Sequence, residues 1–196
     1  MKIIGITGAS GCGKGAVAQI MSHKGALILD CDKIAHDNME PSGIAYKDIA
    51  EAFGSEILNE DKTINRKALG SIVFNDSKKL SLLNSITHKY IVEAIDRSIA
   101  LNRDKRFIVI DAPLLVEAGL QSRCDSVWAV YAPVEMRIER VMSRDGIDRE
   151  SALLRFKNQR SFEDIKAYAD VVITNDGDLE KLEKKVEEIM NNKELF

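Results

Sequence analysis

The chain has 196 residues, of which 45% are hydrophobic and 30% charged, and its formal net charge is −3. Its three prolines and twelve glycines are too few for a collagen-like or low-complexity protein, and no stretch approaches the roughly 20 apolar residues that cross a bilayer. The near-neutral charge gives no general electrostatic reason to bind nucleic acid or an anionic membrane. We therefore expect one compact domain, with room for a lobe inserted into it.

The cysteines and the N-terminus indicate a cytoplasmic location. Cys12, Cys31 and Cys124 form no Cys-x-x-Cys pair, and the three histidines do not cluster with them. This spacing favours a reducing compartment over a disulfide framework or a structural zinc site. The first residues lead directly into a glycine-rich stretch, so we expect no secretory signal.

The N-terminal part predicts a strand, a glycine loop, a helix and a second strand. Residues 2–7 are apolar and β-branched, and they predict the first strand. Glycines break the pattern over 8–13, and helical spacing follows over 15–21. A second apolar run, 26–29, predicts a buried strand that ends at Asp30.

The following region, about 33–103, looks wholly helical. A single crossover helix does not need so many residues, so we predict a helical insertion beside the sheet. Its candidate helices are Ala45–Phe53, Arg66–Phe74 and Ser77–Ala100.

Three further apolar runs predict the remaining strands, at 107–110, 126–131 and 171–174. The segment 135–167, between the last two runs, is rich in arginine. It is interpreted either as a solvated helical face or as a mobile cationic lid. A charged amphipathic stretch, 179–190, predicts a packing helix at the C-terminus. The arginines of this part of the chain are Arg137, Arg140, Arg144, Arg149, Arg155 and Arg160.

The order of these elements predicts an α/β fold with a five-stranded, doubly wound parallel sheet. Continuous apolar runs are typical of strands that helices cover on both faces, and helical stretches separate the runs. We expect a single domain in which residues 1–32, 104–134 and 168–196 form the core. Residues 33–103 would form the insertion, and 135–167 the lid.

The most specific motif is Gly8-Ala9-Ser10-Gly11-Cys12-Gly13-Lys14, which fits Gly-x4-Gly-Lys between a predicted strand and a predicted helix. Glycines let backbone N–H groups curl around phosphate oxygens, and the helix directs its positive end at the same anion. Lys14 adds a full positive charge for the β and γ phosphates. The alternative is a plain glycine turn between a strand and a helix.

The motif departs from the usual pattern at its eighth position, where a Ser or Thr hydroxyl normally ligates Mg²⁺. Gly15 stands there, followed by Ala16, and neither side chain carries an oxygen. Mg²⁺ would then be held by nucleotide oxygens, water and a nearby carboxylate, or turnover would be low. Cys12 is interpreted as a small residue filling the loop rather than as a reactive thiol activated by the helix N-terminus.

Three aspartates follow predicted strands and are expected at the edge of the sheet where ligands bind. Asp30 and Asp32 are two residues apart, so in an extended chain they would face the same way; for Asp30 a helix N-cap is the alternative. Asp32 is the candidate to position or deprotonate an acceptor hydroxyl, and Asp111 is a candidate for the metal shell. Together with the phosphate loop, these carboxylates indicate a nucleotide-dependent phosphotransferase that must exclude water.

Several further stretches follow the phosphate loop in order: Asp30–His36, Asn65–Gly70 with Val73 and Phe74, Leu83–His88, Pro113–Glu117, Glu139–Asp145, Gln159, and Ala169–Ile173 with Asn175 and Gly177. In order and spacing they resemble the dephospho-CoA kinase family over nearly the whole chain. The resemblance implies transfer of the γ-phosphate of ATP, with Mg²⁺, to the ribose 3′-hydroxyl of dephospho-CoA, the last step of coenzyme A synthesis.

The resemblance also implies roles for individual residues. Asp32, Lys14 and Arg140 would be catalytic, and Asp32, His88, Leu114 and Glu117 would bind the acceptor. ATP would be bound by Gly11, Cys12, Gly13, Lys14, Gly15, Ala16, Arg144 and Asn175, with Asn175 near the adenine. A monomer or small homo-oligomer is expected, with no nucleic-acid or membrane partner.

The sequence departs from the family pattern in three places. Gly15 and Ala16 replace Ser-Thr, Lys89 replaces the proline after His88, and Cys31 replaces an alanine. The alternatives that remain are another P-loop nucleoside or nucleotide kinase, or a nucleotide-binding protein whose catalysis is impaired by Gly15.

Overall fold

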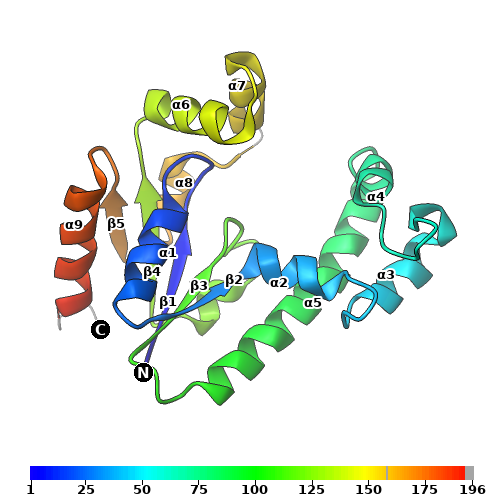
Figure 1. Ribbon diagram of the computed structural model, residues 1–196, viewed down its shortest axis with the longest axis horizontal. Helices are drawn as coiled ribbons and strands as arrows, with labels where there is room; N and C mark the ends of the chain where they lie inside the picture. The colour runs from blue at the N-terminus through cyan, green and yellow to red at the C-terminus, as the bar shows by residue number, and fades with distance from the viewer. Residues whose placement is uncertain (158, 193–196) are drawn as a thin grey trace. The chain divides into compact units, whose positions relative to one another are not determined.

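The computed structural model describes residues 1–157 and 159–192. Its centre is a five-stranded parallel sheet with the strand order β2-β3-β1-β4-β5 (Figure 1). The first strand therefore lies in the middle of the sheet, and later strands add on both sides of it. The strands are β1 (Lys2–Thr7), β2 (Leu27–Asp30), β3 (Phe107–Asp111), β4 (Ser126–Tyr131) and β5 (Val171–Thr174).

The predicted strands agree with the observed ones to within a residue at each end. In the register of the sheet, Ile4 is paired with Val109 on one side, and Ile6 is paired with Trp128 on the other. All four of these side chains are fully buried. Continuous apolar runs marked these strands because helices and loops cover both faces of the sheet.

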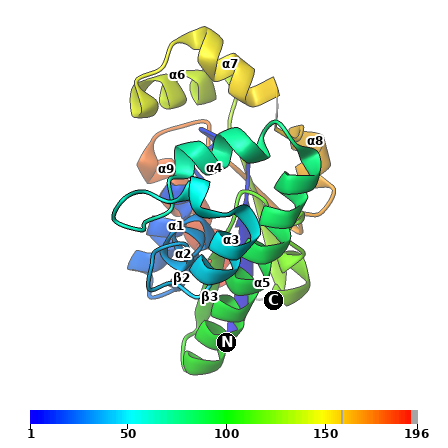
Figure 2. The ribbon, with the colours of Figure 1, turned by 90° about the vertical axis from the view of Figure 1, so that its right-hand side faces the viewer.

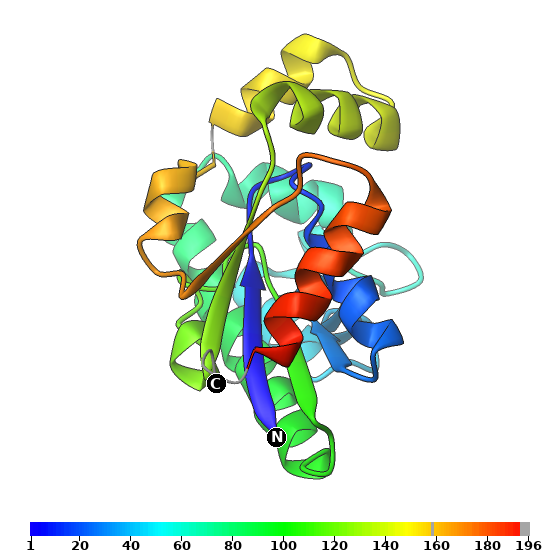
Figure 3. The same ribbon diagram turned by 90° about the vertical axis from the view of Figure 1, so that its left-hand side faces the viewer.

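Helices α1 (Lys14–His23) and α9 (Leu179–Asn191) pack side by side on one face of the sheet (Figure 3). Their buried side chains include Val17 and Met21 from α1, and Val186 from α9. These residues join strand residues in the main core cluster, which also contains Trp128. The amphipathic C-terminal stretch is thus a packing helix, as its pattern predicts.

The arginine-rich stretch forms three helices: α6 (Val134–Asp145), α7 (Arg149–Lys157) and α8 (Phe162–Lys166). Helices α6 and α7 follow the carboxyl end of β4 (Figure 1) and pack against each other. They have a small core of their own, made of Ile138, Val141 and Ala152. All arginines of this stretch except Arg160 therefore lie on two helices that pack against each other.

The chain divides into two compact units, one formed by 1–29 with 102–196 and the other by 30–101. The second unit is helical and has a separate core that includes Ile49, Phe53, Leu69 and Val73. In this unit α2, α3 and α4 each contact the long helix α5 (Figure 2). Its elements are α2 (Cys31–Asn38), α3 (Tyr46–Phe53), the 3₁₀ turn η1 (Ser55–Ile57), α4 (Arg66–Val73) and α5 (Ser77–Leu101).

Helix α5 runs without interruption through His88 and Lys89. A proline at position 89 would remove a helical hydrogen bond and clash with the preceding turn, so lysine suits the continuous helix. Although α5 has 25 residues, neither it nor any other helix in the described part of the chain is apolar over enough of its length to cross a membrane.

The expected extended geometry after β2 is wrong, because helix α2 begins immediately at Cys31. Asp30 is its N-cap, and its carboxylate accepts a hydrogen bond of 3.0 Å from the backbone N–H of Lys33. Asp32 lies in the first helical turn, where a negative charge is favourable next to the helix N-terminus. Asp30 and Asp32 therefore do not face the same way along a strand, and the N-cap alternative for Asp30 is confirmed.

Candidate active site

The phosphate loop connects β1 to α1 over residues 8–13. Gly11 and Gly13 have φ values of 78° and 92°, in the left-handed region. A Cβ atom on Gly11 would lie 2.6 Å from the carbonyl oxygen of Arg137, and one on Gly13 would lie 2.0 Å from Nδ2 of Asn175. Both the backbone conformation and the close approach of α6 and Asn175 therefore require glycine at these two positions.

Lys14 is the first residue of α1, and its Nζ atom lies 2.5 Å from Oδ1 of Asp111. Asp111 is the last residue of β3, which is the neighbour of β1 in the sheet. Both side chains are mostly buried, with 16% and 12% of their surface exposed. The topology thus brings a cation and a carboxylate together at the carboxyl edge of the sheet, where ligands of open α/β sheets bind.

Side chains from outside the loop bind three consecutive carbonyl oxygens of it. Arg137 Nε donates to the carbonyl of Ser10 at 2.9 Å, and Arg140 Nη1 donates to that of Gly11 at 3.3 Å. Asn175 Nδ2 donates to the carbonyl of Cys12 at 2.9 Å, in a buried position. Residues from α6 and from the end of β5 thus meet at the phosphate loop.

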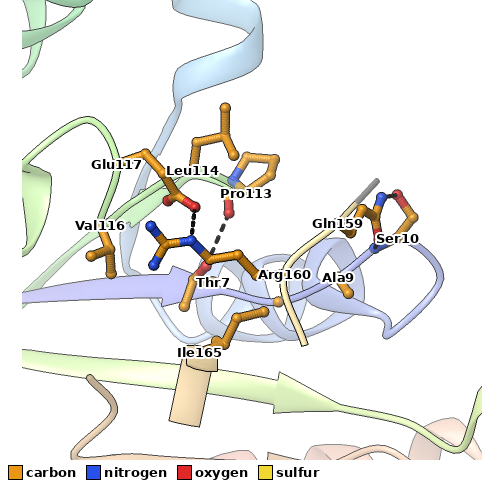
Figure 4. Close-up of a pocket in the computed structure, with 11 residues that line it drawn as sticks. Thr7, Ala9, Ser10, Pro113, Leu114, Val116, Glu117, Gln159, Arg160 and Ile165 are labelled. Atoms are coloured by element: carbon orange, nitrogen blue, oxygen red, sulfur yellow. Dashed lines mark hydrogen bonds and ion pairs between the residues drawn. The ribbon is translucent and has the colours of Figure 1, made fainter. Parts of the chain in front are cut away.

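Gln159 binds the same loop through both ends of its amide (Figure 4). Its Oε1 accepts from the backbone N–H of Ser10 at 3.1 Å, and its Nε2 donates to the Ser10 hydroxyl at 2.6 Å. The chain after α7 is therefore attached to the loop at a single residue by two hydrogen bonds.

A pocket of about 180 Å³ lies between the loop, the segment after β3 and the chain before α8 (Figure 4). An ion pair of 2.7 Å between Arg160 Nε and Glu117 Oε1 forms part of its wall. The pocket therefore combines an apolar lining with one charged pair next to the phosphate loop. Its lining residues are Thr7, Gly8, Ala9, Ser10, Pro113, Leu114, Val116, Glu117, Gln159, Arg160 and Ile165.

Cys12 is buried, with 2% of its surface exposed. Burial raises the pKa of its thiol, although a hydrogen bond from the Lys14 backbone and the charges of Lys14 and Arg137 act in the opposite direction. A raised pKa leaves less thiolate at neutral pH, and thiolate is the reactive form. The structure therefore supports the interpretation of Cys12 as a filler of the loop and not as a reactive thiol.

The residues at the start of α1 do not fit the usual ligation of Mg²⁺ by a phosphate loop. Gly15 and Ala16 offer no oxygen, and a Cβ on Gly15 would meet nothing within 4 Å. Asp111 is a carboxylate at this edge of the sheet, but its Oδ1 is bonded to Lys14. The position has room for a hydroxyl side chain but does not supply one, so the first turn of α1 offers Mg²⁺ no side-chain oxygen.

The structure brings most of the predicted nucleotide-binding residues together. The loop residues 11–16, Asp111, Arg140 and Asn175 lie at one edge of the sheet, and Leu114 and Glu117 line the adjoining pocket. The exception in this unit is Arg144, which is bonded to the neighbouring Asp145. Asp32 and His88 belong to the second compact unit.

The sequence placed Arg137 and Arg160 among the arginines of the candidate lid but indicated no individual role for them. They contact the loop and Glu117 respectively. A signal for Arg137 was present, because 137 and 140 are three residues apart and so lie on one face of a helix. The partner of that face could not be predicted, since Ser10 is 127 residues away in the chain.

The sequence model of the dephospho-CoA kinase family matches residues 2–181. A relative named dephospho-CoA kinase in Geobacter sulfurreducens is 41% identical over 191 residues, covering 96% of this chain and 97% of its own. One with the same name in Syntrophus aciditrophicus is 40% identical over 189 residues, covering 95% of this chain and 80% of its own.

Two solved structures resemble this chain at different levels. Dephospho-CoA kinase from Campylobacter jejuni superposes with a TM-score of 0.69 at 28% identity, covering 96% of this chain and 94% of its own. Shikimate kinase from Acinetobacter baumannii, at 16% identity and a TM-score of 0.54 over 97% and 93% of the two chains, shares the fold. With its phosphate loop, its sheet order and the family match over most of its length, the chain belongs to the dephospho-CoA kinase family of phosphotransferases.

Proposed function

We propose that this protein transfers the γ-phosphate of ATP to the ribose 3′-hydroxyl of dephospho-CoA. The proposal is supported by the phosphate loop, whose Lys14 pairs with Asp111 and which lines a pocket. The chain that carries this loop matches the dephospho-CoA kinase family. The products would be ADP and coenzyme A, and the transferred group would pass directly from one oxygen to the other.

The loop and two cations would stabilise the phosphates of ATP. Backbone N–H groups of 11–16 and the N-terminus of α1 would bind the phosphate oxygens. Lys14 and Arg140 would neutralise negative charge that spreads over the γ-phosphoryl group in the transition state. Arg144 would join them when the α6–α7 segment closes over the nucleotide, and Asn175 would lie next to the adenine.

Leu114 and Glu117, which line the pocket, would contact the acceptor. His88 would contribute to binding the acceptor, as the family resemblance implies. Asp32 would accept a hydrogen bond from the 3′-hydroxyl, orient the oxygen toward the γ-phosphorus, and take its proton as the new bond forms. Closure of a lid formed by 135–167 would exclude water, which otherwise competes as acceptor.

Mg²⁺ would enter this site together with ATP, ligated by phosphate oxygens and water rather than by a hydroxyl of the loop. When bound it would neutralise phosphate charge. The residues of the chain that act on the reacting groups in this proposal are Lys14, Arg140 and Asp32.

The test is a coupled assay of ADP formation with ATP, Mg²⁺ and a panel of acceptors. We expect turnover with dephospho-CoA at about 1 to 100 per second, and analysis of the product should place the new phosphate on the 3′ oxygen. Clear turnover with a nucleoside monophosphate and none with dephospho-CoA would overturn the proposed acceptor. Tight ATP binding without turnover on any acceptor would overturn the proposed catalysis.

A further inference from the structure

Three consecutive peptide groups of the phosphate loop are held from outside by their carbonyl oxygens. Arg137, Arg140 and Asn175 donate to the carbonyls of residues 10, 11 and 12, in that order. We propose that these three side chains form a carbonyl clamp that orients the phosphate loop before the nucleotide binds. In this role they are positioning residues, since they act on substrate through the backbone of the loop.

The orientation of a carbonyl fixes the orientation of the next N–H group. A trans peptide unit is planar, and its C=O and N–H bonds point in opposite directions; the described residues contain no cis peptide bond. A side chain that holds the Ser10 carbonyl therefore directs the N–H of Gly11 the opposite way. The same relation directs the N–H of Gly13 through the carbonyl of Cys12.

Such a clamp is needed because this loop is rich in glycine. Gly11 and Gly13 adopt positive φ angles and have more conformational freedom to lose than other residues. An unrestrained loop would lose that freedom when phosphate binds, which weakens affinity. Donors that are oriented in advance cost no reorganisation at the moment of reaction.

The clamping side chains are themselves held in place. Asn175 is 6% exposed, and its backbone N–H donates to the carbonyl of Tyr131 at 2.7 Å. The guanidinium of Arg137 lies over the ring of Phe156, at 4.3 Å from the ring centroid. Arg140 also contacts the backbone carbonyl of Asn175 at 3.5 Å, so these two clamp residues contact each other.

Gln159 is a fourth side chain that binds the loop, at the same residue as Arg137. It accepts from the N–H of Ser10 and donates to its hydroxyl, while Arg137 Nη2 contacts its Oε1 at 3.5 Å. Ser10 is thus fixed on its amide, its hydroxyl and its carbonyl. The helical pair α6–α7 is attached to the loop by these contacts at the base of the proposed lid.

The clamp rests on the proposed function only in requiring that the loop binds phosphates. Its test therefore uses inorganic tripolyphosphate, which needs no acceptor site. The variants are Arg137→Lys and Asn175→Asp, since lysine keeps the charge of position 137 but lacks the Nε donor, and aspartate keeps the shape of Asn175 but lacks the amide donor. Arg149→Lys is the control, because Arg149 pairs with Glu135 and not with the loop.

We expect tripolyphosphate, measured by calorimetry on the full chain, to bind about tenfold more weakly to Arg137→Lys, the loss of one hydrogen bond from a charged group. Binding to Asn175→Asp should be weaker still, because its new negative charge also repels the anion. Amide exchange over residues 9–15 should become faster before any ligand is added, and the control should match the natural chain. In the kinase assay, KM for ATP should rise and kcat fall while KM for dephospho-CoA stays constant.

Unchanged exchange over 9–15 in Arg137→Lys would overturn the clamp, whatever the acceptor proves to be. The Arg137 side chain is only half-buried on α6, so Arg137→Lys should fold. It therefore provides the test even if Asn175→Asp does not fold. Weaker tripolyphosphate binding with unchanged exchange would also overturn it, because the residues would then act only by their charge. Failure of dephospho-CoA as substrate, with exchange altered as expected, would overturn the proposed function and leave the clamp standing.

Discussion

At the scale of single residues, the proposed catalysis depends on Asp32, which would act on the acceptor hydroxyl. We expect Asp32→Asn to lower kcat with dephospho-CoA by about 100-fold or more, the usual contribution of a positioned general base. The KM for ATP should stay within about twofold, since the amide keeps the size of the carboxylate and the proposed ATP site is the loop. The measurement is steady-state kinetics with each substrate varied in turn.

The matched control for Asp32 is Asp37→Asn, which removes an exposed carboxylate from the same helix. It should leave both parameters near those of the natural chain. Equal losses in kcat and in ATP affinity for Asp32→Asn would assign the carboxylate to nucleotide binding instead.

Gly15 provides a second prediction at this scale, because it stands where a metal-binding hydroxyl is usual. We expect Mg²⁺ to tighten ADP binding only slightly in the natural chain. In Gly15→Ser the gain in ADP affinity on adding Mg²⁺ should be about tenfold larger, which is the lower end of what a group near the metal contributes. Calorimetry of ADP with and without Mg²⁺ measures both values. A serine fits without a clash, since a Cβ at this position meets nothing within 4 Å.

Gly15→Ala separates the hydroxyl from the backbone effect. Both substitutions replace an exposed glycine in the first turn of α1, which should stabilise the helix by up to about 1 kcal/mol. Only the serine supplies an oxygen. The same Mg²⁺ dependence in the natural chain and both variants would show that the hydroxyl plays no part in metal binding here.

At the scale of elements, Asp145 joins α6 to α7. Its carboxylate accepts from Arg144 at 2.7 Å and 3.0 Å and forms an ion pair with Arg155. Hydrogen bonds from these two arginines hold the pKa of Asp145 well below its usual range. A depressed pKa means that the attachment is fully present above the ordinary aspartate pKa of about 3.9. It is lost as pH falls toward the lower folded-state value.

We therefore expect Asp145→Asn to loosen the end of α6 from α7 at neutral pH. Amide exchange over 149–157 should become faster, while the strands of the sheet keep their protection. The contacts of Ile138, Val141 and Ala152 remain, so the helices themselves should persist. Glu163→Gln on α8 is a charge-matched control, and an exchange pattern equal to that control would contradict the assigned contact.

The elements also show what local sequence can predict and what it cannot. The five strands follow from continuous apolar runs, and α9 follows from its amphipathic spacing. Helix α2 was not among the candidate helices, because Cys31 is its only buried residue and it therefore has no apolar stripe. Its Asp-Cys-Asp start was interpreted as extended, with an N-cap at Asp30 as the alternative. The start of the helix is capped by the Asp30 carboxylate, which accepts a hydrogen bond from the Lys33 N–H. This cap depends on the residue type at one position, so hydrophobic periodicity does not predict it.

The same limit applies to the site. The glycine-lysine motif predicted the loop because its function depends on adjacent residues. The donors to the loop carbonyls come from positions more than 120 residues away, and nothing in a local pattern pairs Asn175 with Cys12. The local sequence therefore predicted the phosphate loop itself better than the distant side chains that hold it.

At the scale of the whole molecule, each compact unit has its own buried core, and the single tryptophan reports on only one of them. Trp128 is fully buried on β4 in the main core, whereas the second unit is helical and centred on residues such as Ile49. Fluorescence thus follows the first unit, and far-UV circular dichroism follows the helices of both. Cooperative unfolding of the whole chain requires the two transitions to coincide.

We expect Ile49→Ala to separate these transitions. Ile49 is fully buried, and removing its side chain should cost the second unit about 2–5 kcal/mol, so part of the helical signal should be lost at lower urea than the tryptophan signal. Val109 lies on β3 and is fully buried in the main core, so Val109→Ala should instead lower the midpoint of the fluorescence transition. If Ile49→Ala shifts both probes by the same amount, the second unit does not unfold by itself, and the two cores stabilise one another as a single cooperative structure.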